Sequence, residues 1–168
     1  MRRLVLIRHA KAAQGAVDVE RPLDPRGERD APAIGRWLAE HDLVPDHVVV
    51  SPARRTVQTW RLASASVAGS VSLEPVIDVH LYRNTVEDLL EAVRPAPADT
   101  RTLALVGHNP SLEELAMTLD DGRGDARARR ELATKFPTSA IAVFELQTDW
   151  AGVDSATGTL RRFAAPRG

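Results

Sequence analysis

The chain has 168 residues, of which 43% are hydrophobic and 27% charged, with a formal net charge of −1. Near-neutral charge and an aromatic content of only 4% disfavour a nucleic-acid-binding role. There is no cysteine, which excludes disulfides and thiolate sites, and no apolar run approaches the roughly 20 residues of a membrane span. We therefore expect one globular domain over residues 1–168, cytoplasmic and monomeric by default.

Apolar runs alternate with helix-like stretches along the chain. Strands are predicted at residues 3–7, 47–50, 71–76, 102–106 and 140–146, with an edge strand at 159–163. Helices are predicted at about 26–41, after 51–52, and at 85–93, 109–117 and 126–134. Asp24 can cap the first helix with Pro25 as its first residue, and Ser51–Pro52 is expected to open the next helix in the same way. The tail after Gly152 is expected to form an edge hairpin with a frayed end.

This alternation predicts an α/β fold, a three-layer α/β/α sandwich around a mostly parallel central sheet. Ligands of such sheets bind beyond the carboxyl ends of the strands, so the residues that follow each strand are the candidates for a functional site.

Three of the predicted strands end in hydrogen-bond donors. The segments are "RHAK" at 8–11, "SPARR" at 51–55 and "GHNPS" at 107–111. In a parallel sheet these segments share one edge, where they offer guanidinium groups, two imidazoles and helix N-termini, with no acidic residue among them. Guanidinium forks and helix N-termini bind phosphate oxygens, so the sequence predicts a site for a phosphate dianion.

Each segment alone has an ordinary structural interpretation. An Arg-His after a strand is usually a surface turn, and Ser-Pro and Asn-Pro commonly begin helices. Two histidines could also ligate a metal ion, but no third ligand has suitable spacing and the flanking arginines would repel a cation. The coincidence of all three segments favours the phosphate site over a metal site.

The chemistry of such a site is restricted by what the sequence lacks. Without an acidic cluster for Mg²⁺ or a GxxxxGK[ST] loop, a kinase and a two-metal phosphatase are disfavoured. Without cysteine, a thiolate phosphatase is excluded. Histidine remains as a nucleophile that can form a covalent intermediate.

Five segments resemble the histidine phosphatase superfamily, which is phosphoglycerate-mutase-like in fold, and within it the SixA type of phosphohistidine phosphatase. These segments are "LVLIRHAKA" (4–12), "ERPLDPRG" (20–27), "SPARRTVQT" (51–59), "LVGHNPSLEEL" (105–115) and "KFPTSAIAVFEL" (135–146). Thr56 replaces the alanine usual in the third segment. The order of the segments, over most of the chain, makes the resemblance specific.

The resemblance implies a role for each matching residue. His9 would be the nucleophile that becomes phosphorylated, and Arg8, Arg55 and His108 would bind the phosphoryl group. The spacing from Ser51 selects Arg55, with Arg54 as the alternative.

The resemblance also implies contacts at the rim of the site for Lys11, Arg21 and Asn109, and neither a metal nor an organic cofactor.

The predicted site has no obvious proton donor for a leaving oxygen. Many members of the superfamily carry a glutamate after the third strand, whereas here the nearest groups are Asp78 and His80, before Glu87 in a predicted helix. A histidine leaving group, with an ordinary pKa of about 6.5, departs far more easily than an alkoxide. The sequence therefore favours a protein phosphohistidine as substrate, for example on a histidine-containing phosphotransfer domain.

Two alternatives stay open: a phosphatase of small phosphate esters, and a non-catalytic module that binds phosphate or a phosphoprotein. An attacking imidazole must be neutral, so a catalytic His9 also predicts that activity fails in acid.

Overall fold

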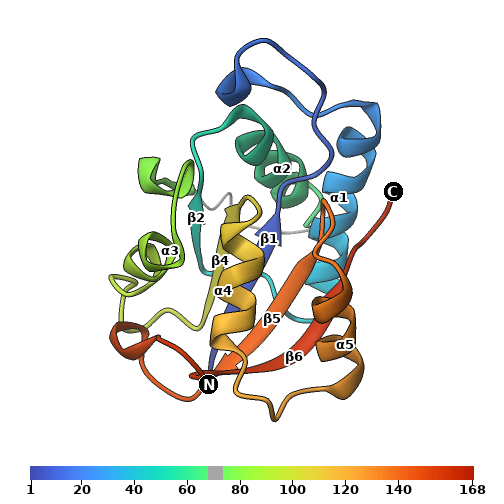
Figure 1. Cartoon of the computed structure of the whole chain (residues 1–168). Helices are drawn as coiled ribbons and strands as arrows, with labels where there is room; N and C mark the ends of the chain where they lie inside the picture. The colour runs from blue at the N-terminus through green and yellow to red at the C-terminus, as the bar shows by residue number, and fades with distance from the viewer. Residues whose placement is uncertain (68–73) are drawn as a thin grey trace.

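The computed structural model describes residues 1–67 and 74–168. Its strands form one six-stranded sheet in the order β3-β2-β4-β1-β5-β6. The strands are β1 (Arg2–Arg8), β2 (His47–Val50), β3 (Val76–Ile77), β4 (Thr102–Gly107), β5 (Ile141–Leu146) and β6 (Gly158–Ala164). The β1–β4, β2–β4 and β2–β3 pairs are parallel, and β5 and β6 add an antiparallel edge (Figure 1).

Helices cover both faces of this sheet (Figure 1). They are α1 (Pro25–Glu40), α2 (Arg54–Ala65), α3 (Val86–Val93), α4 (Ser111–Leu119) and α5 (Ala126–Thr134), with short 3₁₀ turns η1 (Asp18–Glu20), η2 (Val79–Leu81) and η3 (Trp150–Gly152). The predicted α/β fold, phosphoglycerate-mutase-like and with a mostly parallel sheet, is confirmed.

Side chains of β1 alternate between two cores, which explains the layers. Leu4 and Leu6 belong to a buried cluster with residues of α3, α4 and α5. Val5 and Ile7 belong to a second cluster with residues of α1 and α2. Because successive strand residues point to opposite faces, an uninterrupted apolar run is what a sheet buried on both faces requires.

The first helix begins as its sequence predicts. Asp24 accepts a hydrogen bond from the Gly27 amide at 2.8 Å, with Pro25 at the first helical position. A Cβ at Gly27 would stand 2.1 Å from the Lys11 carbonyl oxygen, so only glycine allows the helix to approach the segment after β1 this closely.

Three details of the predicted elements are wrong. Within the described residues, the third strand is only Val76–Ile77, and residues 71–73 of the predicted 71–76 lie outside them. The second helix starts at Arg54 with Ala53 at the N-cap position and no side-chain cap, so Ser51 lies too early in the chain to be the N-cap. The end of the chain is not frayed, since the Gly168 amide donates to the buried carboxylate of Asp30 at 3.0 Å.

No helix in the described part of the chain combines the length and apolar character needed to span a bilayer.

Candidate active site

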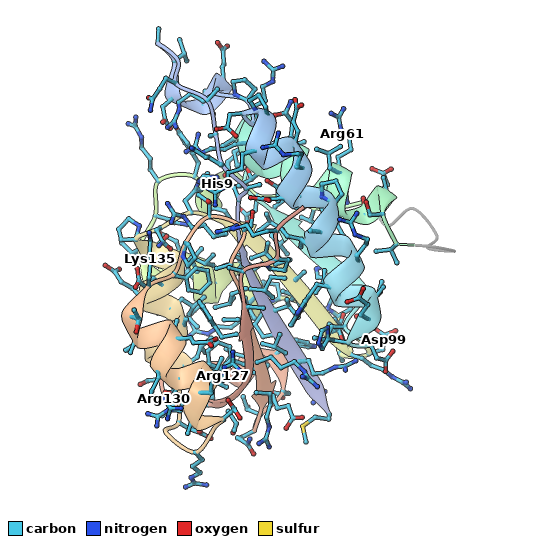
Figure 2. The ribbon with its side chains drawn as sticks, turned by 90° about the vertical axis from the view of Figure 1, so that its right-hand side faces the viewer. His9, Arg61, Asp99, Arg127, Arg130 and Lys135 are labelled. Atoms are coloured by element: carbon cyan, nitrogen blue, oxygen red, sulfur yellow. The ribbon has the colours of Figure 1, made fainter. Side chains whose placement is uncertain are left out.

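The ends of three parallel strands lie side by side. Arg8 pairs with Gly107, and Val50 with Val106, so the residues that follow these strands emerge at one edge of the sheet. The His9 amide donates to the Gly107 carbonyl at 3.1 Å. Figure 2 shows His9 well away from Asp99, which precedes β4. The expected clustering at the carboxyl edge is therefore present.

His9 is buried, with 8% of its surface exposed, and a contact with the next residue's carbonyl group orients its ring. Its Nδ1 lies 2.7 Å from the Ala10 carbonyl oxygen, a group that can only accept, so we assign the proton to Nδ1. The Nε2 atom then carries the lone pair. The His9 carbonyl in turn accepts from the Ser139 amide at 3.0 Å, and Ser139 adopts a left-handed backbone with φ of 66°.

Burial lowers the pKa of His9 to about 4, against the opposing effect of the Ala10 hydrogen bond. The cationic groups of Arg55, Arg8 and Arg21 lower it further. His9 is therefore neutral at pH 7, as a nucleophile must be, and the expected acid limit lies nearer pH 4 than the ordinary 6.5.

His108 lies next to His9, with ring centroids 5.3 Å apart and planes tilted by 54°. Its Nε2 lies 2.8 Å from the Ser51 hydroxyl, which also accepts from the Ala53 amide at 3.3 Å. The hydroxyl proton is then available to Nε2, which leaves the proton of the ring on Nδ1. Burial lowers the pKa of His108 to about 3, helped by His9 and Arg55, so this ring too is neutral.

Arg8 and Asn109 converge on one backbone oxygen. Arg8 Nη1 donates to the Phe136 carbonyl at 2.9 Å and Asn109 Nδ2 donates to the same oxygen at 3.0 Å. Within the described residues, Arg8 Nε and His108 Nδ1 are buried without a hydrogen-bond partner. Buried donors without partners are costly. Arg2 Nε and Trp60 Nε1 are single examples elsewhere in the described residues, whereas two such donors flank His9, an arrangement suited to an anion.

The structure separates the two candidate arginines of α2. Arg55 is 7% exposed and lines a cavity of about 220 Å³ beside His108, whereas Arg54 is exposed at the first turn of the helix. The described lining of this cavity comprises Asp18, Arg55, Tyr82, Arg83, Asn84, His108, Asn109, Pro110 and Ser111.

Asp18 was missed by the sequence analysis. Its backbone carbonyl accepts from Arg55 Nη1 at 2.9 Å, and its carboxylate from Arg55 Nη2 at 3.2 Å. Arg21 and the hydroxyl of Tyr82 donate to the same carboxylate. Hydrogen bonds from Tyr82 and Arg21 hold the pKa of Asp18 far below its usual range. The sequence offered one signal for such a residue, which is that a cluster of guanidinium groups needs a negative counter-charge. Several acidic residues could have provided that charge, so the signal did not select Asp18.

The other predicted contacts differ in their surroundings. Arg21 donates to Asp18 and to the Ala13 carbonyl, so it supports the site through Asp18. Lys11 is half exposed and lies 3.8 Å from Asp24, outside the cavity lining. The roles of both residues stay predictions.

The candidate proton donors lie apart from the cavity. His80 has a side chain that is 74% exposed and lies 3.0 Å from the carboxylate of Asp78, and neither residue is among the described lining. Glu87 is in α3, as predicted, and pairs with Arg94.

The described residues contain no group of three histidine, cysteine, aspartate or glutamate side chains placed to hold a metal ion. The arrangement thus offers one neutral imidazole with a free nitrogen, surrounded by donors suited to an anion.

Comparison with known proteins agrees with this geometry. Residues 4–81 match the profile of the histidine phosphatase superfamily (branch 1). An uncharacterised protein of Mycobacterium tuberculosis, Rv1276c, is 35% identical over 164 residues, which cover 96% of this chain and 100% of that protein. The chain belongs to the histidine phosphatase superfamily.

Solved structures place it near the SixA type within this superfamily. The "putative phosphohistidine phosphatase SixA" of Nakamurella multipartitia is 33% identical with a TM-score of 0.86, covering 98% of this chain and 96% of that one. A SixA structure from Agrobacterium tumefaciens is 28% identical with a TM-score of 0.79, covering 98% of each chain. The superfamily and this likeness support a phosphatase, and the resemblance of the five sequence segments is confirmed at this level.

Proposed function

We propose that the protein is a metal-independent phosphohistidine phosphatase that acts on a phosphorylated protein. The observation that carries the proposal is the state of His9: a buried, neutral imidazole whose Nδ1 proton is held by the Ala10 carbonyl. Its Nε2 lone pair is free for attack on phosphorus.

Two transfers of the phosphoryl group make up the reaction. His9 Nε2 forms a bond to phosphorus while the bond from phosphorus to the substrate imidazole nitrogen breaks, and that nitrogen keeps the electron pair. Arg8, Arg55 and His108 donate hydrogen bonds to the phosphoryl oxygens, which gain charge in the transition state. Water then attacks the phosphorylated His9, and this step releases inorganic phosphate and restores the imidazole.

The preference for a nitrogen-bound phosphoryl group follows from the state of the nearest acid. Asp18 is the carboxylate among the described lining residues, and its hydrogen bonds keep it ionised at neutral pH. It therefore holds no proton for a leaving alkoxide, whereas an imidazole leaves without strong acid assistance. The neighbours named SixA support the same substrate class.

A paired assay tests the proposal on wild type and His9→Ala, with EDTA present throughout. Each is given a phosphohistidine-bearing phosphotransfer domain and, separately, p-nitrophenyl phosphate. We expect release of phosphate from the phosphoprotein by wild type alone. His80→Ala is the matched control, since this exposed histidine lies outside the cavity lining and its loss should leave the rate unchanged.

Each alternative has its own signature in this assay. Turnover of the ester alone would make the protein a small-molecule phosphatase. Phosphate binding without turnover of either compound would make it a binding module. Loss of activity in EDTA, restored by a divalent cation, would contradict metal independence.

A further inference from the structure

Asp18 joins three side chains that come from distant parts of the chain. Arg55 belongs to α2, Tyr82 follows η2, and Arg21 lies three residues beyond Asp18. All three donate to the one carboxylate, and Arg55 Nη1 also reaches the backbone oxygen of the same residue. Asp18 thus accepts four hydrogen bonds from side chains, whereas a simple surface ion pair needs only one.

The segment that carries Asp18 is anchored at its base. The Ala13 amide donates to the Pro22 carbonyl at 2.8 Å and the Asp24 amide donates to the Lys11 carbonyl at 2.9 Å. Ala12 and Leu23 form an antiparallel bridge between the same two arms. Figure 1 shows this segment projecting beyond the carboxyl ends of β1 and β2. Asp18 is therefore presented on a braced loop rather than on a free one.

Asp18 fixes the orientation of Arg55 without using all its donors. A guanidinium group has five N–H donors. Two of them donate to Asp18, so three remain for other acceptors. Within the described residues the Arg55 guanidinium has no other hydrogen-bond acceptor, so Asp18 is the group that orients its plane.

The same carboxylate fixes Tyr82 beside His108. The Tyr82 ring meets the His108 ring edge-on, with centroids 5.9 Å apart, and the Arg55 guanidinium lies 6.0 Å from the Tyr82 centroid. Both Tyr82 and Arg55 line the cavity. The Asp18 carboxylate thus positions two side chains that line the cavity beside His108.

We propose that Asp18 is a positioning residue for phosphoryl transfer, which holds Arg55 and Tyr82 in the orientation that the transition state requires. The proposal rests on the part of the proposed function that assigns phosphoryl binding to Arg55. Asp18 itself does not contact the phosphoryl group, because its negative charge would repel the phosphoryl oxygens.

The negative charge of Asp18 and its hydrogen bonds have opposite effects: the charge weakens phosphate binding, whereas the hydrogen bonds raise the rate of transfer. The two effects can therefore be measured separately. Replacing Asp18 by Asn removes a negative charge beside an anion site, which strengthens the binding of inorganic phosphate. The same change loosens the guanidinium plane and the Tyr82 ring, which lowers the rate of transfer. A purely structural role would instead weaken phosphate binding and turnover together.

The kinetic experiment uses phosphoramidate as substrate and inorganic phosphate as competitive inhibitor. We expect Asp18→Asn to lower kcat by roughly 10- to 100-fold, a loss typical of a misplaced catalytic group. The inhibition constant of phosphate should stay equal or fall. Asp24→Asn is the matched control at the base of the same loop, because asparagine is an equally good helix N-cap and both Tm and kcat should be retained.

A spectroscopic readout follows the contact itself. Tyr82 is the single tyrosine of the chain, so the phenolate absorbance reports on it alone. The hydrogen bond to Asp18 raises the pKa of Tyr82, while Arg83 and Arg55 lower it, and His108 is the remaining ring that faces it. We expect the titration midpoint to fall in Asp18→Asn, whereas an unchanged midpoint would overturn the contact on which the proposal depends.

The outcomes separate this proposal from the proposed function. If wild type cleaves phosphoramidate but not the phosphoprotein, the proposed substrate is wrong and the Asp18 comparison still decides the positioning role. If wild type cleaves neither, calorimetric titration with phosphate decides: binding must weaken in Arg55→Ala and persist in Asp18→Asn. Weaker phosphate binding in Asp18→Asn, or an unchanged kcat, would overturn the positioning role.

Discussion

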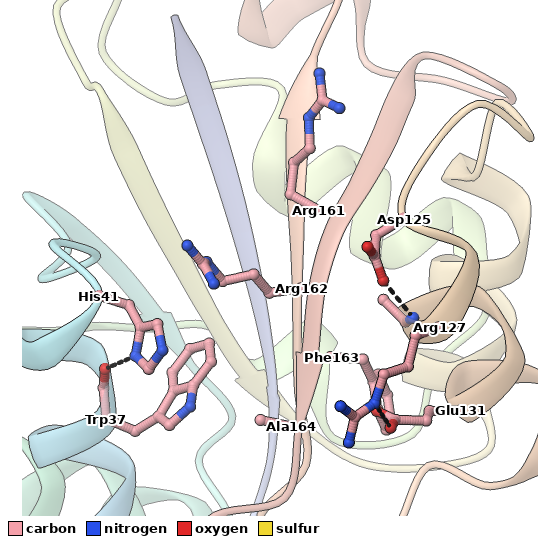
Figure 3. A pocket seen from close by; sticks show the side chains of 10 residues that line it. Trp37, His41, Asp125, Arg127, Glu131, Arg161, Arg162, Phe163 and Ala164 are labelled. Atoms are coloured by element: carbon pink, nitrogen blue, oxygen red, sulfur yellow. Dashed lines mark hydrogen bonds and ion pairs between the residues drawn. The ribbon is translucent and has the colours of Figure 1, made fainter.

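Arginines line two hollows of the described structure, one at the carboxyl end of a central strand and one at the β6 edge of the sheet, and their surroundings differ. The first is the cavity beside His108, which follows β4. The other is a larger groove of about 310 Å³ between α1, β6 and α5, shown in Figure 3. It continues into a neighbouring hollow that reaches Arg3, at the start of β1. By strand geometry, Arg3 and His9 are about 20 Å apart.

The charges of the α1–β6–α5 groove are largely paired with each other. Arg127 Nε lies 2.9 Å from Glu131, and Arg161 Nε lies 2.7 Å from Glu145. The Arg127 side chain is 83% exposed. The site at His9 instead has two buried donors without a partner, Arg8 Nε and His108 Nδ1, beside one such acceptor, Asn109 Oδ1. Buried unpartnered donors beside a neutral imidazole, rather than volume or arginine count, therefore set the candidate site apart from the groove.

The strongest test of this contrast removes a buried arginine. Arg55→Ala should lower kcat/KM for phosphoramidate by roughly 10²- to 10³-fold, because each preorganised donor to a developing oxyanion is worth about that much. Arg127→Ala, in the groove, should leave the rate within about twofold. Steady-state kinetics on both variants measures the difference.

A second variant at the same position shows whether Arg55→Ala loses activity because the protein unfolds. Arg55→Lys keeps a charge near Asp18 but loses the planar fork, so it should retain the fold while most of the rate is lost. A fully active Arg55→Lys variant would show that only the charge matters, and would contradict orientation by Asp18.

The histidine pair predicts a pH dependence of stability. The folded protein keeps His9 neutral down to pH about 4 and His108 down to about 3, whereas an unfolded histidine binds a proton near pH 6.5. As the pH falls from 6.5 to 4, the unfolded state gains protons that the folded state does not bind, so stability is lost. Each histidine contributes about 1.4 kcal/mol per pH unit across this window.

Chemical denaturation at pH 7, 6, 5 and 4.5 measures this slope. His9→Gln and His108→Gln should each give a shallower decline in the free energy of unfolding than wild type. Equal slopes in the three proteins would show that neither ring is held neutral by the fold.

A smaller effect is expected from the support of His108. Ser51→Ala removes the hydroxyl that lies 2.8 Å from His108 Nε2, and leaves that nitrogen without its hydrogen-bond partner. One such hydrogen bond is worth about 1–1.5 kcal/mol, so kcat should fall about tenfold with KM little changed. Ser66→Ala, which removes only a bond to the Leu62 carbonyl in α2, is the control.

Sequence reasoning predicted that the candidate residues meet at one edge of the sheet, but not which of them contact one another. The apolar runs before Arg8, Ser51 and Gly107 sufficed to predict parallel strands with a shared edge, since both faces of the sheet had to be buried. The sequence predicts a helix cap at Ser51, whereas its hydroxyl lies against His108, because Ser-Pro before a helix has the same local pattern in either case.

Contacts between loops could not be predicted from the sequence, because loops have no periodic pattern. The meeting of Asp18 with Tyr82 joins residues 64 positions apart through a loop and a 3₁₀ turn, neither of which has a periodic pattern. The docking of Gly168 on Asp30 spans 138 positions. Spacing along the chain carries information about strands and helices, whereas loop positions depend on the packed molecule.

The smallest effect is expected for substitutions in the α1–β6–α5 groove, which should leave activity almost unchanged. Arg161→Ala breaks a cross-strand pair with Glu145 that is worth about 0.2–1 kcal/mol. The double variant with Glu145→Ala should recover part of that loss, because the unpaired carboxylate is removed as well. Urea denaturation measures the cycle, and kcat/KM for the phosphoprotein should match wild type in all three variants. A lower kcat/KM for the phosphoprotein alone, with phosphoramidate turnover intact, would mean that the groove contacts the protein substrate and that the two hollows share one function.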